Sequence, residues 1–268
     1  MKLGLITINY NNQKDTQELV KGLNKQTDKN FILFIADHSD KQPLKLSVED
    51  NVIIKCFENN GYSAGVNKGL AYFASKGIKQ YVVINNDIRV TKDFTARIKE
   101  SFKWFKVFGA KIYYEKGFEY HKKYSKDQLG KVLWYAGGWF DWKNAYVNHR
   151  GVDRVESDEF NVVEETEFIT GCFFAFDKDV FSQVGFWDER YFLYYEDADY
   201  SLRVKKANFY LIYNPEVFLY HKNAQSTDGS GSLFHQKIQR ESRFRFALKY
   251  APLKTKLHII KNYYLYRK

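Results

Sequence analysis

The fold is decided by the stretch Tyr81-Val82-Val83-Ile84-Asn85-Asn86-Asp87-Ile88-Arg89-Val90. Its first four residues are apolar and mostly β-branched, which predicts a fully buried strand. Asp87 follows that strand, at the sheet edge where open α/β folds bind ligands. With Asn85 two residues earlier on the same side, it is a candidate ligand of Mg²⁺ or Mn²⁺ bound to a diphosphate. The motif alone favours a plainer interpretation, because Asn-Asn-Asp is ordinary turn chemistry.

Strands and helices alternate through the first hundred residues. We expect strands over residues 3–8, 31–36, 52–57 and 81–85, a helix from 16 to about 25 capped by Asp15, and a second helix ending near 75. This order predicts a parallel, Rossmann-like sheet. Three of these strands are followed by polar residues that can reach one cleft, namely Asp37, Asn60-Gly61 and Asp87. The glycines of 60–65 precede a helix N-terminus and predict an anion site there.

The second half of the chain begins irregularly. Residues 115–165 are rich in Tyr, Lys, Trp and Gly, which favours functional loops. A buried strand is expected over 168–176, and a helix should begin near Glu196, Asp197 and Asp199. A helix N-terminus stabilises carboxylates, yet three of them in an aromatic setting are costly without a partner or a function. Arg203 lies four residues after Asp199, which favours an ion pair and gives Asp199 a structural role.

The charge is concentrated at the C-terminal end of the chain. Residues 233–268 contain ten Lys and Arg against one acid, a net +9 out of +10 for the 268-residue chain. The pI near 9.2 and 18% aromatic content suggest nucleic-acid binding, but confinement of the charge to this segment argues against a body-wide groove. No transmembrane-length run or signal peptide is recognised, and Cys56 and Cys172 are expected to be buried thiols in a reducing cytoplasm.

Five segments together resemble the family 2 glycosyltransferases, inverting GT-A enzymes that use nucleotide-diphosphate sugars, and most closely the rhamnosyltransferase-like bacterial branch. The segments are Thr7-Ile8-Asn9-Tyr10-Asn11, Asp37-His38-Ser39, residues 60–67, Asn85-Asn86-Asp87 and residues 171–221. Their order and spacing are specific, although none is specific alone. The resemblance implies transfer of a sugar from dTDP-rhamnose or a UDP-sugar to a hydroxyl of a cell-surface glycan, often lipid-linked.

The resemblance also implies a role for each matching residue. Thr7, Asn9 and Asp37 would contact the base and ribose, and Asn60, Gly61, Asn67 and Asn86 would line the nucleotide-sugar cleft. Asp87 and His221 would hold Mn²⁺ or Mg²⁺, although a lone His after a strand is more often structural. Asp197 would be the catalytic base, and Trp187, Asp188, Glu189 and Glu196 would bind the acceptor. The sequence departs from the family's Asp-x-Asp motif at Asn85, which stands in place of its first Asp.

These roles divide the chain into a GT-A catalytic domain over 1–222 and a basic amphipathic helical tail over 223–268. Within the domain, 1–114 would bind the nucleotide sugar and 115–222 the acceptor. In the tail, Leu253, Leu257, Ile260 and Tyr264 fall on one helical face among basic residues. Two interpretations stay open: the face docks on the inner surface of the cell membrane, or it packs on the catalytic domain or a second subunit.

Two alternative functions share parts of this pattern. A sugar-phosphate nucleotidyltransferase has a similar first half, but it needs a Gly-rich basic loop after the first strand, where this chain has Asn9-Tyr10-Asn11-Asn12. An inactive carbohydrate-binding relative is the second, and the presence of Asp87, Asp197 and His221 together argues against it.

Overall fold

The computed structural model describes residues 1–222 and 233–265. Its strands are β1 (Leu3–Asn9), β2 (Phe31–Asp37), β3 (Val52–Cys56), β4 (Gln80–Ile84), β5 (Ile88–Val90), β6 (Val107–Tyr114), β7 (Leu133–Tyr135), β8 (Gly138–Asp141), β9 (Tyr146–His149), β10 (Glu164–Glu165), β11 (Phe173–Asp177) and β12 (Ile212–His221). Its helices are α1 (Gln13–Asn24), α2 (Tyr62–Ser75), α3 (Phe94–Ser101), the 3₁₀ turn η1 (Asp158–Phe160), α4 (Lys178–Val184), α5 (Glu196–Lys206), α6 (Leu233–Tyr250) and α7 (Leu253–Leu265).

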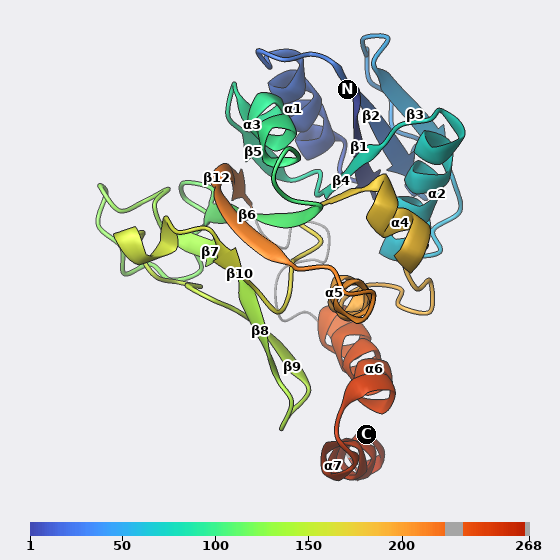
Figure 1. Cartoon of the computed structure of the whole chain (residues 1–268), viewed down its shortest axis with the longest axis vertical. Coiled ribbons are helices and arrows are strands. Elements are labelled where there is room, and N and C mark those ends of the chain that lie inside the picture. The colour runs from blue at the N-terminus through green and yellow to red at the C-terminus, as the bar shows by residue number, and fades with distance from the viewer. Residues whose placement is uncertain (223–232, 266–268) are drawn as a thin grey trace.

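A large mixed sheet runs through the molecule in the order β10-β12-β6-β11-β4-β1-β2-β3 (Figure 1). Strands β3, β2, β1 and β4 are parallel to one another, and β12 is parallel to β6, whereas β11 is antiparallel to both β4 and β6. The predicted α/β fold with a mostly parallel sheet is therefore confirmed. The parallel strands align the residues after β1, β2 and β4 along one edge.

Each face of the sheet is covered by its own helices. On β4, Val82 and Ile84 join the buried cluster that contains apolar residues of α1 and α3. Tyr81 and Val83 point the other way, into the cluster that contains residues of α2, α4 and α5. This alternation is why an uninterrupted apolar run forms a strand that is buried on both faces.

Several boundaries differ from the sequence expectations. Helix α1 begins at Gln13, because the side chain of Asn12 rather than Asp15 is its N-cap and accepts from the Asp15 amide. The expected strand over 168–176 begins only at Phe173. Residues 115–165 are more regular than predicted, since β8 and β9 form an antiparallel hairpin within them. Cys56 is exposed, so only Cys172 is a buried thiol.

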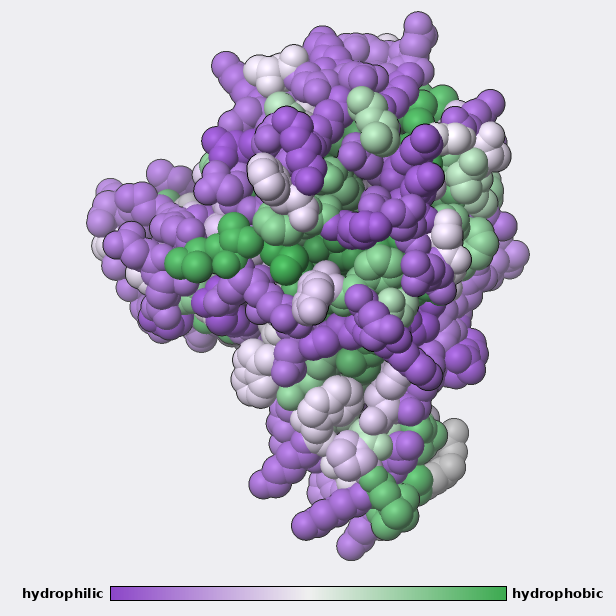
Figure 2. All heavy atoms as spheres, viewed as in Figure 1, coloured by the Kyte–Doolittle hydropathy of each residue, from purple (hydrophilic) through white to green (hydrophobic). Residues whose placement is uncertain are grey.

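The basic C-terminal segment forms the helices α6 and α7, which continue below the sheet on the side of α5 and the β8–β9 hairpin (Figure 1). Phe246 of α6 is fully buried against the rings of Phe140, Trp142 and Tyr195. For α6 this supports packing on the catalytic domain. On α7, Ile259 is buried whereas Leu253 and Leu257 are exposed, and apolar residues gather at this lower end of the molecule (Figure 2).

The α7 contact with a membrane therefore stays a prediction. The side chain of Tyr264 and residues 223–232 and 266–268, which belong to the expected tail, lie outside the described part of the chain. Within residues 1–222 and 233–265, no helix has both the length and the apolar character needed to cross a membrane.

Candidate functional site

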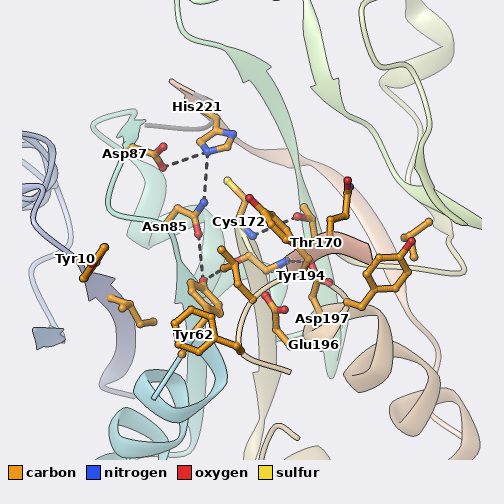
Figure 3. A pocket seen from close by; sticks show the side chains of 18 of the residues that line it. Tyr10, Tyr62, Asn85, Asp87, Thr170, Cys172, Tyr194, Glu196, Asp197 and His221 are labelled. Atoms are coloured by element: carbon orange, nitrogen blue, oxygen red, sulfur yellow. Dashed lines mark hydrogen bonds and ion pairs between the residues drawn. The ribbon is translucent and has the colours of Figure 1, made fainter. Parts of the chain in front are cut away.

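A cavity of about 590 Å³ opens where the edge of the sheet meets the N-terminus of α5. It brings together predicted site residues from distant parts of the sequence: Gly61, Asn86, Asp87, Glu196, Asp197 and His221. Asp87 and His221 lie at one end, and Glu196 and Asp197 project from α5 at the other (Figure 3).

Asp87 and His221 meet because β5 pairs with the end of β12, with Ile88 opposite His221. Both side chains are buried, and His221 Nε2 lies 3.1 Å from Asp87 Oδ1. Burial alone would raise the pKa of Asp87, but His221 lowers it below its ordinary value. Burial alone would lower the pKa of His221, whereas Cys172 and Asp87 raise it well above the ordinary value. The pair is therefore an ionic contact as long as nothing else neutralises the carboxylate.

The same two atoms fit a divalent cation. Apart from its contact with His221, the buried Asp87 Oδ1 has no hydrogen-bond partner among the described residues. Two neighbouring ligands of one octahedral ion, each at about 2.1 Å, lie about 3 Å apart, which matches this oxygen-to-nitrogen distance. Within the described ranges, no group of three or more His, Cys, Asp or Glu side chains is arranged to hold a metal ion. Asp87 and His221 would therefore supply two ligands of the cation, and a substrate would complete its coordination shell.

Glu196 and Asp197 are the first two residues of α5, and Tyr195 before them has a left-handed backbone with φ of 67°. Asp197 Oδ2 accepts from the Gly171 amide and Oδ1 from the Ala198 amide, each at 2.8 Å. Burial raises the pKa of Asp197 to about 6, against the lowering effect of these bonds. Burial and the neighbouring Asp197 raise the pKa of Glu196 well above its ordinary value. Glu196 Oε2 is buried without a partner in the described structure.

Tyr62 and Asn85 connect the two ends of the cavity. The Tyr62 hydroxyl lies 3.1 Å from Asn85 Oδ1 and 3.0 Å from the Gly171 carbonyl oxygen, and Asn85 Nδ2 lies 3.4 Å from His221 Nε2 (Figure 3). A chain of polar contacts therefore runs from the Asp87–His221 pair toward the backbone that holds Asp197.

The predicted glycine loop has a different use from the one expected. Gly61 has φ of 94°, and a Cβ there would lie 2.4 Å from the Phe192 carbonyl oxygen. That oxygen accepts from the Tyr62 amide at 2.7 Å, so the first amide of α2 already has a partner. Only glycine permits this close approach of two backbones. The loop thus anchors the segment before α5. An anion bound at the start of α2, as the sequence predicts, could not use the Tyr62 amide, because Phe192 already accepts from it.

Three predicted nucleotide-binding residues form a buried network beneath the cleft. Asn9 Nδ2 donates to Asp37 Oδ1 at 2.8 Å, and Thr16 Oγ1 donates to Asn9 Oδ1 at 2.7 Å. Asn86 Nδ2 donates to Thr16 Oγ1 at 2.9 Å and so ties the end of β4 to the end of β1. Burial alone would raise the pKa of Asp37, but bonds from Leu44, Ser39 and Asn9 lower it. Among these, only Asn86 lines the cavity; Thr7, Asn9 and Asp37 do not.

The remaining predicted residues also lie outside the cavity lining, namely Asn60, Asn67, Trp187, Asp188 and Glu189. Asn67 has a clear structural role, because it accepts from the Trp187 amide and donates to the Trp187 carbonyl and to Glu189 Oε1. The Trp187 ring is buried and stacked on Tyr200. Asp188 pairs with Arg190, which lowers its pKa. These contacts tie the 187–189 segment to α2, so the acceptor role predicted for it has no support from the cavity.

Other lining residues were not predicted from the sequence. They are Ile8, Tyr10, His38, Asn59, Tyr62, Trp134, Tyr146, Val147, His149, Phe168, residues 170–172, residues 192–195 and Gln239 of α6. The Trp134 ring contacts both His221 and His149 at 4.5 Å between centroids. Burial lowers the pKa of His149 to about 4, so this imidazole is neutral. His38 lies between Asp37 and Ser39 in a motif that follows a strand, and this was a usable sequence signal; most of the others lie in stretches without a local pattern.

Comparison with known proteins gives a consistent picture. The sequence model described as Glycosyl transferase family 2 matches residues 5–185. The chain is 32% identical over 105 residues to the N-acetylglucosaminyl-diphospho-decaprenol L-rhamnosyltransferase of two Mycobacterium tuberculosis strains. That match covers 39% of this chain and only 31% of the relative.

Two solved structures share the fold at low sequence identity. One is GalNAc-T7 with UDP, GalNAc and Mn²⁺, with a TM-score of 0.62 and 11% identity over 92% of this chain and 48% of that one. The other is the mannosyltransferase PcManGT from Pyrobaculum calidifontis with GDP-Man and Mn²⁺, with a TM-score of 0.53 and 12% identity over 99% of this chain and 70% of that one. At these identities the likeness is one of fold.

Proposed function

The chain belongs to glycosyl transferase family 2, and from this premise we propose that it transfers a sugar from a nucleotide diphosphate to an acceptor hydroxyl, with inversion at the anomeric carbon. The observation that carries the proposal is the cavity itself. At one end it has an Asp–His pair suited to a diphosphate-bound cation, and at the other the buried Glu196 and the half-buried Asp197. We propose that residues 1–114 contribute mainly to the donor side and residues 115–222, apart from His221, mainly to the acceptor side.

On the donor side, Asp87 and His221 would hold Mn²⁺ or Mg²⁺. When bound, such a cation acts as a Lewis acid that stabilises the charge of the departing diphosphate. For their part, Asp87 must be ionised and His221 must present an unprotonated Nε2. The contact between these two atoms, and the lack of any other partner for the Asp87 oxygen in the described structure, support this use of the pair. The Asn86 network keeps the end of β4, and with it Asp87, fixed against β1.

On the acceptor side, Asp197 is the proposed base. Two backbone amides hold its carboxylate in one orientation, and the remaining lone pairs can accept the proton of the incoming hydroxyl. A pKa near 6 suits this role, since the group is ionised at neutral pH and still basic enough to take a proton. Glu196, with an unpaired buried oxygen, is placed to bind an acceptor hydroxyl.

For the substrates, we propose dTDP-rhamnose or a UDP-sugar as donor and a lipid-linked cell-envelope glycan as acceptor. The name of the mycobacterial relative supports a rhamnosyl donor and an acceptor of the glycosyl-diphospho-polyprenol class. The solved structures of the same fold contain UDP and GDP-Man, so the nucleotide must be determined directly.

The test is a donor panel of dTDP-rhamnose, UDP-GlcNAc, UDP-Gal, UDP-Glc and GDP-Man, with Mn²⁺ and with excess chelator. We expect one donor to raise the melting temperature and to be hydrolysed slowly, and both effects to need the cation. With a GlcNAc-diphospho-alkyl acceptor, the product should carry the inverted anomeric linkage. A panel in which no nucleotide sugar binds or turns over would refute the proposal.

A further inference from the structure

Helix α6 lies against residues 192–195, which line the cavity, and against the turn before β9, whose first residues Tyr146 and Val147 line it. The Ser242 hydroxyl donates to the Leu193 carbonyl at 2.8 Å, next to Tyr194 and Tyr195. The Arg243 guanidinium donates to the Asn144 carbonyl at 2.6 and 3.0 Å, in the turn between β8 and β9. Helix α6 therefore joins the segment that precedes the two carboxylates to the β8–β9 turn.

One aromatic ring and one amide face the cavity where these parts meet. Tyr146 begins β9, lines the cavity and keeps 46% of its surface exposed. The Arg243 guanidinium lies 3.8 Å from the centre of the Tyr146 ring and so fixes its orientation. Gln239, one turn earlier on α6, lines the same cavity with an exposed side chain.

An oriented aromatic ring beside an amide is suited to a sugar. The apolar face of a pyranose covers the ring, and the amide offers both a donor and an acceptor to the hydroxyl groups around it. The two groups share a cavity with Glu196 and Asp197. The Tyr195 hydroxyl donates to the Ala145 carbonyl at 3.2 Å, so the residue before Tyr146 contacts the residue before Glu196.

We propose that Tyr146 and Gln239 form an acceptor subsite that binds a pyranose of the acceptor glycan, with Arg243 as a positioning residue for the Tyr146 ring. That this sugar belongs to the acceptor rests on the proposed function. In this proposal α6, which lies in the segment expected to be a tail, forms part of the binding site.

Binding of free sugars tests the subsite without requiring turnover. Saturation-transfer NMR would be recorded with methyl glycosides of N-acetylglucosamine, glucose, galactose, mannose and rhamnose. We expect at least one to bind the full chain, Tyr146→Ala to weaken it about tenfold, and Gln239→Ala about fivefold through the loss of a hydrogen bond. Arg243→Met should weaken binding less than Tyr146→Ala, and Tyr146→Phe should retain it.

The chain offers matched controls for both variants. Trp139 is an exposed aromatic residue of the same hairpin, and Lys237 is an exposed residue of α6; neither lines the cavity. Trp139→Ala and Lys237→Ala should leave glycoside binding unchanged. The proposed subsite would be refuted if the unmodified chain bound none of the five glycosides. It would also be refuted if Tyr146→Ala and Gln239→Ala bound a glycoside as tightly as the unmodified chain does. Donor hydrolysis by the unmodified enzyme separates this failure from a failure of the proposed function.

Discussion

Asp199→Asn should destabilise the protein while leaving the chemistry of the site intact. Asp199 is completely buried, and its two oxygens already have three partners. Oδ2 accepts from Arg203 Nε at 2.9 Å, and Oδ1 accepts from Lys249 Nζ at 2.5 Å and the Tyr250 hydroxyl at 2.8 Å. The carboxylate thereby connects α5 to α6, and it does not line the cavity.

The size of the stability loss depends on the charges that are left without a partner when an amide replaces the Asp199 carboxylate. Breaking a buried ion pair by removing one partner costs about 3–5 kcal/mol. Arg203 and Lys249 keep 23% and 32% of their side-chain surface exposed, so water can partly replace the lost carboxylate. We therefore expect the lower end, about 3 kcal/mol, which lowers the melting temperature by roughly 6–12 °C in a chain of this size.

Urea and thermal denaturation of Asp199→Asn measure this loss, and kcat at a temperature where the variant is folded measures the chemistry. Glu100→Gln is the control, because Glu100 forms an exposed pair with Lys103 and its loss should change stability by less than about 1 kcal/mol. The reasoning fails if Asp199→Asn melts normally, or if the folded variant has lost turnover.

Three further predictions concern the two ends of the cavity and the C-terminal helix. Asp87→Ala should abolish the Mn²⁺-dependent part of nucleotide binding in calorimetry while the protein stays folded; a Mn²⁺ effect of normal size would count against the pair. Because the base must be ionised and burial raises the pKa of Asp197 to about 6, kcat/KM should fall as the pH drops below about 6, by about tenfold per pH unit; a flat profile down to pH 4 would contradict this. Leu253→Ser with Leu257→Ser should weaken sedimentation with anionic liposomes, since both side chains are exposed on a basic helix; unchanged sedimentation would exclude α7 as the contact.

The parallel half of the sheet was predictable because its signals are local. The run from Tyr81 to Ile84 is apolar on both faces, and such strands alternate with amphipathic helices from the start of the chain. Polar residues at the ends of these strands indicated where the cavity would lie. The meeting of Asp87 with His221 depends on β5 pairing with β12, a contact between distant segments that no local pattern encodes, and the resemblance to a family supplied it.

The contacts of the acceptor side could not be predicted from local sequence, for the same physical reason. Trp187 and Glu189 belong to a segment that carries the family resemblance, yet this segment is hydrogen-bonded to Asn67 of α2 and neither residue lines the cavity. Tyr146 and Gln239 are ordinary surface residues by sequence, and they face the cavity only because α6 packs on the β8–β9 turn. A basic helix with apolar positions gives no indication of which surface it will cover.

The most direct test of the account is the effect of Asp197→Asn on the separate steps of transfer. Single-turnover transfer and donor affinity with Mn²⁺ would be measured for the unmodified enzyme, Asp197→Asn and Glu196→Gln, with melting temperatures as a check because an amide can accept only one of the two backbone bonds held by Asp197. We expect Asp197→Asn to keep donor and metal affinity and to lose the chemical step by about 10²–10⁴-fold, and Glu196→Gln chiefly to raise the acceptor KM. An active Asp197→Asn variant, alongside a folded Glu196→Gln variant that has lost turnover at saturating acceptor, would contradict the assignment of the base.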